Sequence, residues 1–154
     1  MAELHKVEIL LVEDNSQDIE LALYALRREN LANHIEVARD GEEALDFLFC
    51  RGRHSGRNMD EQPRLVLLDL KLPKVDGLEV LRQIKGDPRT KAIPIVIMTS
   101  SREETDMVQG YKLGVNAYIQ KPVDFDQFRQ IVNQIGLFWL VVNQSPPPSA
   151  FLAD

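Results

Sequence analysis

The sequence predicts an α/β fold in which a parallel sheet carries helices on both of its faces. Short apolar runs alternate five times with stretches whose apolar residues recur at helical spacing. The runs are almost continuously apolar, which is typical of parallel strands buried on both faces. Such an alternation of strands and helices needs crossover connections, and these place the helices on both sides of one sheet.

Five apolar runs account for the predicted strands. The first is broken only by Glu8, and the second is short and alternating. Pro94 opens the fourth run, where a proline is tolerated as the first residue of a strand. The predicted strands are 7–12, 34–38, 65–69, 94–99 and 117–120.

Capping residues mark the helix starts, and glycine or proline marks their ends. Asn15 or Ser16 is expected to cap the first helix, and Asp124 the last. The fourth helix covers 103–113 and is closed by Gly114. The remaining signals are Asp40-Gly41 and Asp76-Gly77 at the starts of the second and third helices, Gly86-Asp87-Pro88 at the end of the third, and Ser145-Pro146-Pro147-Pro148 after the last.

The composition describes one globular domain. With 44% hydrophobic and 27% charged residues, 154 residues suffice for a single core. The net charge of −6 argues against general binding of a phosphate backbone, so no nucleic-acid partner is expected. The single Cys50 leaves no internal disulfide and fits a reducing compartment. We expect residues 1–143 to form the domain and 144–154 a proline-rich tail, without a separate output domain.

The sequence gives no sign of targeting or of membrane insertion. Residues 1–5 lack a basic start followed by an apolar stretch. The longest apolar run, 135–142, is far too short to cross a bilayer. The expectation is therefore a cytoplasmic protein without a membrane partner.

Segment 51–62 shows no periodicity and is predicted to be a loop longer than usual. Its three arginines, Arg51, Arg53 and Arg57, form a small basic patch in the sequence. The patch either belongs to a solvated loop or contacts a partner.

Acidic, hydroxyl and basic side chains that could take part in a reaction follow four of the predicted strands. Glu13 and Asp14 follow the first, Asp69 ends the third, Thr99 ends the fourth and Lys121 follows the fifth. In a parallel sheet these carboxyl ends meet at one edge, where ligands bind. Each residue alone is as readily a cap or turn residue, but their joint placement predicts a single site.

Three carboxylates at one edge raise each other's pKa values or recruit a cation, and their hard oxygen ligands suit Mg²⁺. Asp69 is the predicted phosphoryl acceptor, because a carboxylate that attacks phosphorus forms an acyl phosphate. Mg²⁺ held by Asp14, with Glu13 assisting, would offset the repulsion between acceptor and donor. Lys121 and Thr99 would contact the phosphoryl oxygens.

Five stretches between about residue 7 and residue 135 closely resemble the receiver domains of bacterial two-component response regulators. The resemblance implies a flavodoxin-like sheet of order 2-1-3-4-5 with five helices, and phosphorylation of Asp69 by a partner histidine kinase. The matching stretches are Ile9-Leu-Leu-Val-Glu-Asp-Asn, Val66-Leu-Leu-Asp-Leu, Leu72-Pro-Lys-Val-Asp-Gly-Leu-Glu, Met98-Thr-Ser and Gly114-Val-Asn-Ala-Tyr-Ile-Gln-Lys-Pro.

The resemblance also implies individual roles. Mg²⁺ would be bound by Asp14, Asp69 and the backbone carbonyl of Lys71, with Glu13 assisting. The Lys121-Pro122 bond would be cis. Thr99 and Tyr118 would form a switch, in which the hydroxyl moves towards the phosphate and the ring turns inward. Such a protein is not expected to be an enzyme beyond catalysing its own phosphorylation and dephosphorylation.

More narrowly, the chain is similar to the single-domain regulators paired with cyanobacterial phytochromes. The long 51–62 loop and the extended end at 136–143 carry this similarity. It implies a phytochrome as the partner kinase. The alternative is a degenerate receiver that acts as a phosphorylation-independent dimerisation or interaction module.

The last predicted helix becomes apolar on every side towards its end, and such a helix needs cover on every side. We therefore predict a homodimer through this helix, with Phe138, Trp139, Leu140 and Val142 at the interface. The alternative is that the tail folds back over the patch. The apolar seam of the helix is Phe125, Phe128, Val132, Ile135, Trp139 and Val142, and Leu137, Phe138, Leu140 and Val141 widen it.

Three other classes of protein fit the residues less well. A phosphatase with an aspartate nucleophile typically has a second acid two residues later, where this chain has Lys71. In a flavin-binding domain, Glu13 and Asp14 would repel the cofactor phosphate. A nucleoside-triphosphate hydrolase needs a Gly-x-x-x-x-Gly-Lys-Ser/Thr loop, which the sequence lacks.

Overall fold

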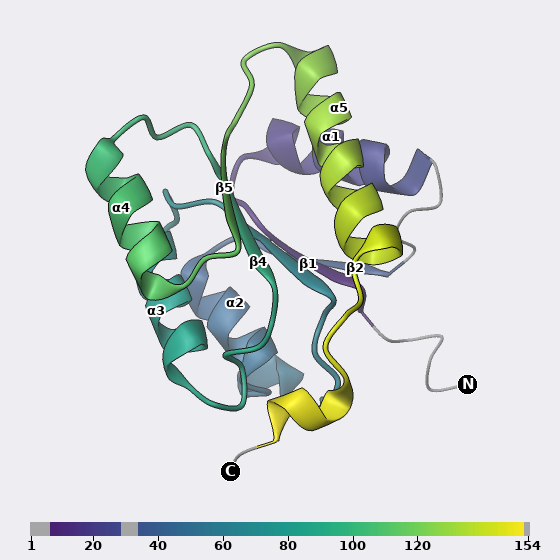
Figure 1. The fold of residues 1–154 in the computed structure, drawn as a ribbon, viewed down its shortest axis with the longest axis vertical. Coiled ribbons are helices and arrows are strands. Elements are labelled where there is room, and N and C mark those ends of the chain that lie inside the picture. The colour runs from purple at the N-terminus through teal and green to yellow at the C-terminus, as the bar shows by residue number, and fades with distance from the viewer. Residues whose placement is uncertain (1–6, 29–33, 153–154) are drawn as a thin grey trace.

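A single parallel sheet forms the centre of the molecule (Figure 1). The structure is a computed structural model, and it describes residues 7–28 and 34–152. Within these residues five strands lie in the order β2-β1-β3-β4-β5, with every neighbouring pair parallel. This confirms the predicted order. The strands are β1 Ile9–Val12, β2 Ile35–Ala38, β3 Leu65–Leu68, β4 Ile95–Thr99 and β5 Ala117–Gln120.

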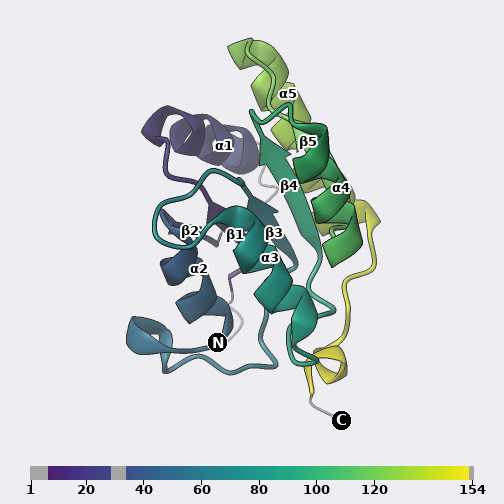
Figure 2. The same ribbon diagram turned by 90° about the vertical axis from the view of Figure 1, so that its left-hand side faces the viewer.

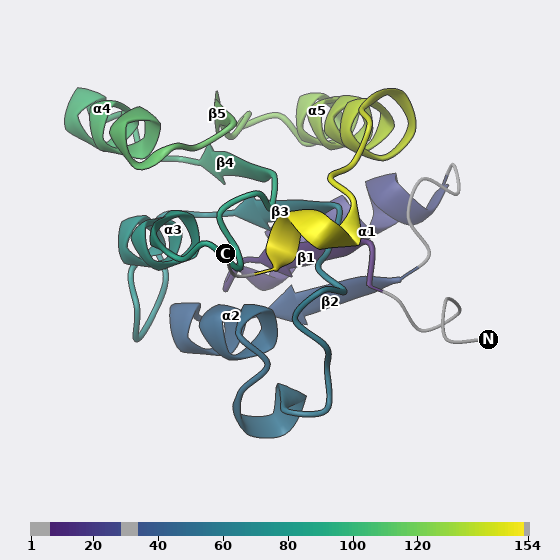
Figure 3. The ribbon, with the colours of Figure 1, turned by 60° about the horizontal axis from the view of Figure 1, so that its bottom comes forward.

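Among the described residues, five α-helices cover the two faces of the sheet, as predicted. Figure 3 shows the layers, with α2, α3 and α4 on one side and α1 and α5 on the other. Figure 2 looks onto the side that carries α2, α3 and α4. The helices are α1 Ser16–Arg28, α2 Gly41–Leu48, α3 Gly77–Gly86, α4 Glu104–Leu113 and α5 Phe125–Gly136.

The sheet separates two apolar cores, because successive strand residues point to opposite faces. In β1, Leu10 and Val12 belong to the core under α2 and α3, whereas Ile9 and Leu11 belong to the core under α1 and α5. All four residues of β1 and of β3 are buried. The continuous apolar runs that predicted these strands therefore reflect burial on both faces.

Strand register aligns the carboxyl ends of the central strands. Val12 pairs with Leu68, and Leu68 pairs with Ile97. The residues that follow β1 and β3 therefore leave the sheet side by side. Gly77 starts α3 against this edge, where a Cβ atom would lie 2.4 Å from the carbonyl oxygen of Asp69. Only glycine allows so close an approach.

Helix capping follows the sequence signals. Asn15 rather than Ser16 caps α1, since its Oδ1 accepts a hydrogen bond from Asp18 N at 3.0 Å. Asp124 caps α5 by accepting from the amides of Asp126 and Gln127. Gly114 ends α4 with φ of 100°, a left-handed conformation that glycine adopts at little cost.

The last helix continues past α5 as a π-helical segment, Leu137–Val142, before the chain turns back. The following residues cross the end of the sheet opposite to the acids (Figure 3). Arg64 Nε, just before β3, donates to Ser145 Oγ at 3.0 Å. A short 3-10 turn, Pro148–Phe151, then buries Phe151 in the core under α2 and α3. The predicted tail is therefore packed against the domain as far as it is described.

Each arginine of the 51–62 loop has a partner within the domain. Arg57 lies with its guanidinium 3.7 Å from the centre of the Phe47 ring and donates to the carbonyls of Phe47 and Glu61. Arg53 pairs with Glu43 at 2.6 Å and Arg51 with Asp46 at 3.5 Å. Arg57 is therefore held inside the domain, whereas Arg51 and Arg53 stay at the surface with 53% and 69% of their side chains exposed.

None of the helices in the described part of the chain is long and apolar enough to cross a lipid bilayer.

Candidate functional site

Three carboxylates meet at the carboxyl edge of the sheet, as the sequence predicted. One oxygen each from Glu13, Asp14 and Asp69 can be chosen so that all three lie within 4.8 Å of one another. Glu13 and Asp69 are 4% and 6% exposed, whereas Asp14 is exposed. Two buried acids and one open acid make a pocket that a hard divalent cation could enter from solvent.

Lys121 brings a positive charge to the same edge. Its backbone N–H donates to Thr99 O at 2.8 Å, so the end of the β4–β5 ladder sets its position. Its Nζ lies 2.6 Å from Glu13 Oε1, 2.8 Å from Asp18 Oδ2 and 3.0 Å from Asp69 Oδ2. The other oxygen of Asp69 accepts from Leu70 N at 2.7 Å. Both oxygens of the predicted acceptor are thus oriented by hydrogen bonds.

The pocket holds more negative than positive charge, and the pKa values respond. Burial raises the pKa of Glu13 from 4.5 to about 7, and the charge of Asp69 adds to this, although Lys121 opposes it. Burial lowers the pKa of Lys121, but the hydrogen bonds that its ammonium donates to Asp18 and Glu13, with the charge of Asp69, outweigh burial and raise that pKa above its usual range. Lys121 therefore stays charged, while the Glu13 carboxyl is protonated in part of the molecules and ionised in the rest near neutral pH.

Thr99 ends β4 and is fully buried. Its Oγ1 accepts from Ser101 N at 3.2 Å, which leaves the hydroxyl proton free to donate elsewhere. Its predicted contact with a phosphoryl group stays a prediction.

Tyr118 lies half-buried in β5, with its ring against α4. A Cβ atom at Gly110 would lie 3.4 Å from the Tyr118 ring, so the ring packs closely against this part of α4. The hydroxyl oxygen is buried without a hydrogen-bond partner among the described residues. Burial, with the charge of Asp106, raises the pKa of the hydroxyl. The ring packs against α4 in this structure, and its part in a switch stays a prediction.

Lys71 lies two residues beyond Asp69, and its side chain turns away from the acids. Its Nζ is 3.8 Å from Asp106 Oδ2 on α4, and Ser101 Oγ donates to the same oxygen at 2.6 Å. Lys71 can therefore serve the predicted metal site only through its backbone, and that role stays a prediction.

The expectation of a cis bond between Lys121 and Pro122 is wrong. No peptide bond between described residues is cis. The trans isomer is favoured by about 0.5–1 kcal/mol before a proline, and the Lys121 side chain lies 3.0 Å from Asp69 while this bond is trans. The pocket therefore closes without the rarer isomer.

Asp18 is a member of the pocket that the sequence analysis missed. Nothing in the sequence pattern placed Asp18 in the pocket, yet its carboxylate contacts Lys121 at 2.8 Å. The missed signal was its spacing. Asp18 lies three residues after the cap Asn15, on the turn of α1 that follows the acid-bearing end of β1.

The predicted dimer residues are only partly available for contact. Phe138 and Val142 are 48% and 59% exposed, and Leu137 and Val141 lie open beside them. Trp139 is half-buried and packs edge-on against Phe138, with ring centres 5.1 Å apart. Leu140 is 5% exposed, because it points into the core under α1 and α5. In this structure Leu140 therefore faces the core and not the exposed patch, and the predicted interface between two chains stays a prediction.

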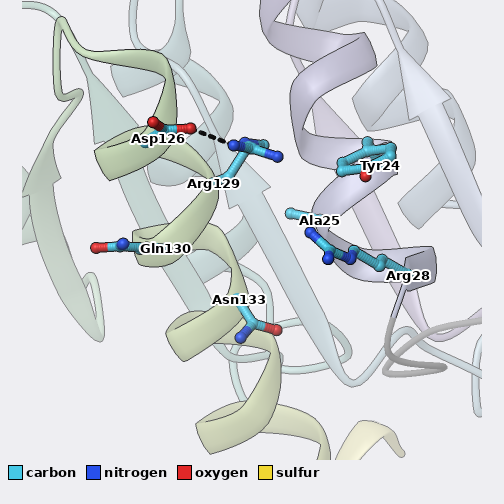
Figure 4. Close-up of a pocket in the computed structure, with 7 residues that line it drawn as sticks. All are labelled: Tyr24, Ala25, Arg28, Asp126, Arg129, Gln130 and Asn133. Carbon is cyan, nitrogen blue, oxygen red and sulfur yellow. Dashed lines mark hydrogen bonds and ion pairs between the residues drawn. The ribbon is translucent and has the colours of Figure 1, made fainter.

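A separate hollow of about 370 Å³ lies between α1 and α5 (Figure 4). Arg28 and Arg129 both lie near the Tyr24 ring, at 5.8 and 5.7 Å from its centre. Arg129 is paired with Asp126. The lining residues include neither Asp69 nor Lys121, so this hollow is distinct from the acidic pocket.

Known proteins resemble this chain over nearly its whole length. The profile of the response regulator receiver domain matches residues 9–133. The probable methanogenesis regulatory protein FilR2 of Methanothrix harundinacea (strain 6Ac) is 45% identical over 141 residues, which are 92% of this chain and 88% of that protein. Response regulator Rcp1 of Synechocystis sp. is 39% identical over 132 residues, 86% of this chain and 88% of that protein.

Two solved structures share the fold closely. The phosphorylated cyanobacterial phytochrome response regulator RcpA superposes with a TM-score of 0.85 at 43% identity, covering 92% of this chain and 99% of that chain. The Mn²⁺-bound form of Rcp1 also gives 0.85, at 38% identity, covering 91% of this chain and 99% of that chain. One similar protein has thus been seen phosphorylated and another with a divalent cation.

Proposed function

The chain belongs to the response regulator receiver family of two-component systems, and from this premise we propose that it accepts a phosphoryl group on Asp69 from a histidine kinase. One observation carries the proposal. Asp69 lies 3.0 Å from Lys121 and within 4.8 Å of two further acids, at the carboxyl edge of a parallel sheet. That arrangement joins a nucleophile, a cation site and a fixed positive charge.

In the proposed transfer, an Asp69 carboxylate oxygen attacks phosphorus. The new O–P bond forms as the bond from phosphorus to the donor breaks, and the donor leaves with that electron pair. The Leu70 amide and the Lys121 ammonium orient the carboxylate beforehand, at 2.7 and 3.0 Å. Positioning of this kind supplies much of the catalysis in phosphoryl transfer.

Charge is the main obstacle, since donor and acceptor are both anionic. Mg²⁺ bound by Glu13, Asp14 and Asp69, with the Lys71 carbonyl, would supply the positive charge that these groups lack. Lys121 would neutralise one phosphoryl oxygen as a point charge. The free proton of the Thr99 hydroxyl would donate to another.

The same transfer would reset the face that carries α4. A phosphoryl group that draws the Thr99 hydroxyl makes the inward position of the Tyr118 ring the favoured one. Of α4, whose residues are all described, only Gly110 is buried. A helix that buries so little can move at a small cost in free energy, so it is suited to transmit a signal to a partner.

We propose a phytochrome-type kinase as the donor and a homodimer as the working form. The similarity to RcpA and Rcp1 supports the first. Exposed Leu137, Phe138, Val141 and Val142 support the second, because packing between two copies would cover the patch that the described tail leaves open.

Phosphorylation is tested with acetyl phosphate and Mg²⁺, read by intact mass. The wild type should gain one phosphoryl group and Asp69→Asn none. Equal labelling of both proteins would place the acceptor elsewhere. Transfer from an autophosphorylated phytochrome kinase, compared with an unrelated kinase at equal concentration, tests the choice of donor.

The dimer is tested by light scattering on Phe138→Asp and Leu137→Asp. Both should shift the mass towards one chain, while the exposed Tyr24→Asp, on α1, serves as a control for added charge. An unchanged mass in the first two variants removes the proposed interface.

A further inference from the structure

Asp18 differs from the other acids around Lys121 because neither metal binding nor phosphorylation is assigned to it. The inference rests on the proposed phosphoryl transfer. In the described chain, the Lys121 ammonium contacts Glu13, Asp18 and Asp69 at 2.6, 2.8 and 3.0 Å. An ammonium has three protons to donate, so these contacts use its full capacity.

The two other partners are committed to the reaction. Glu13 and Asp69 belong to the acid cluster that can hold a cation, and an Asp69 oxygen becomes the acceptor. Both would weaken their hold on Lys121 as the reaction proceeds. Asp18 lies on α1 and can keep its contact throughout, since nothing in the transfer calls on its oxygens.

Helix capping does not explain the position of the Asp18 carboxylate. Asn15 already caps α1 by accepting from Asp18 N at 3.0 Å. The Asp18 side chain is 24% exposed and turned to Lys121, which is 9% exposed. Glu20, two residues later on the same helix, faces solvent. The two acids therefore have different surroundings despite their closeness in the sequence.

We propose that Asp18 is a positioning residue for phosphoryl transfer, which holds the Lys121 ammonium beside Asp69 while Glu13 and Asp69 engage the metal and the phosphoryl group. One ammonium proton stays on Asp18, and the others are left for a phosphoryl oxygen. The position of the charge is thereby fixed from α1, across 103 residues of sequence.

The first measurement is the rate of phosphorylation by acetyl phosphate at saturating Mg²⁺, read by intact mass. Asp18→Ala should be slower by between about tenfold and about a hundredfold, because a misplacement of about 1 Å in a catalytic group can cost about a hundredfold. Asp18→Asn should lose less, since its amide oxygen still accepts a hydrogen bond. The matched control Glu20→Ala removes the same charge from the same helix and should match the wild type.

The direction of the change in phosphorylation rate distinguishes a loss of positioning from the mere loss of a negative charge. Removing a negative charge near the pocket would by itself favour an anionic donor and speed the reaction. In a Lys121→Ala background, Asp18→Ala should have no further effect. A rate for Asp18→Ala at or above the wild type, or an equal slowing without Lys121, would overturn the inference.

The second measurement does not need phosphorylation. Lysines of the Mg²⁺-loaded protein are acetylated with an N-hydroxysuccinimide ester and quantified by peptide mass. Lys121 should be modified several times faster in Asp18→Ala than in the wild type or Glu20→Ala, relative to exposed Lys112. If the wild type accepts no phosphoryl group, the proposed function is wrong. If the rate of Lys121 modification is unchanged in Asp18→Ala, the positioning inference is wrong, whatever the outcome for phosphorylation.

Discussion

The binding of Mg²⁺ should weaken sharply on the acid side of neutrality, and Glu13 should be the cause. Burial raises the pKa of this carboxyl to about 7 in the metal-free pocket. A metal that uses Glu13 must therefore displace a proton at low pH, whereas at high pH it meets an ionised ligand.

The magnitude follows from the pKa. The Glu13 carboxyl is protonated in about nine tenths of the protein molecules at pH 6 and in about one tenth of them at pH 8. The dissociation constant should therefore be about tenfold larger at pH 6 than at pH 8, which corresponds to about 1.4 kcal/mol.

Isothermal titration calorimetry with Mg²⁺ at a series of pH values measures this directly. Glu13→Gln should bind more weakly at pH 8 and should show little change between the two pH values. Glu20→Gln, which alters an exposed acid of α1, should keep the wild-type profile. An affinity of the wild type that does not change with pH, or a slope that survives Glu13→Gln, would refute the reasoning.

Three further outcomes follow from the same structure. Without metal, the free energy of unfolding should fall by about 2.5 kcal/mol between pH 5 and pH 8. The pKa of Glu13 is higher in the folded state (about 7) than in the unfolded state (4.5), so the stability present at low pH is lost as pH rises through 7. Urea unfolding, with Glu13→Gln as the control, tests this. Gly110→Ala should stabilise α4 by about 0.5–1 kcal/mol in the same assay, since its Cβ would make ordinary contacts of 3.4 Å with Ile97 and Tyr118; a loss of stability would show that the ring needs more room. Phe151→Ala should destabilise the domain by about 3–5 kcal/mol, whereas exposed Leu152→Ala should change little; equal, small effects would mean that the tail is not part of the core.

The sequence sufficed for the sheet and for most of the pocket because both depend on patterns that burial makes strict. Strands such as β1 must be apolar on both faces, and the side chains that follow them must meet at one edge. Glu13, Asp69 and Lys121 were therefore found without knowledge of the helices.

What the sequence left open depends on which way single side chains point. Leu140 belongs to a helix end that is apolar all round, and period alone does not say which residue faces the core. The inward turn of Arg57 onto Phe47 needs the path of an aperiodic loop. Asp18 was hidden for the opposite reason, since an acid in the first turn of a helix already has a sufficient local explanation.

The register of β1 against β3 means that an intact pocket reports on the native topology. Its charged groups come from positions as distant as 13 and 121, and they converge only when the ladders of β1, β3, β4 and β5 have formed. A cation that needs this convergence binds the folded chain alone and draws the folding equilibrium towards it. In a preparation that mixes folded and misfolded chains, the fraction that can be phosphorylated on Asp69 would therefore measure the fraction with a correctly formed sheet.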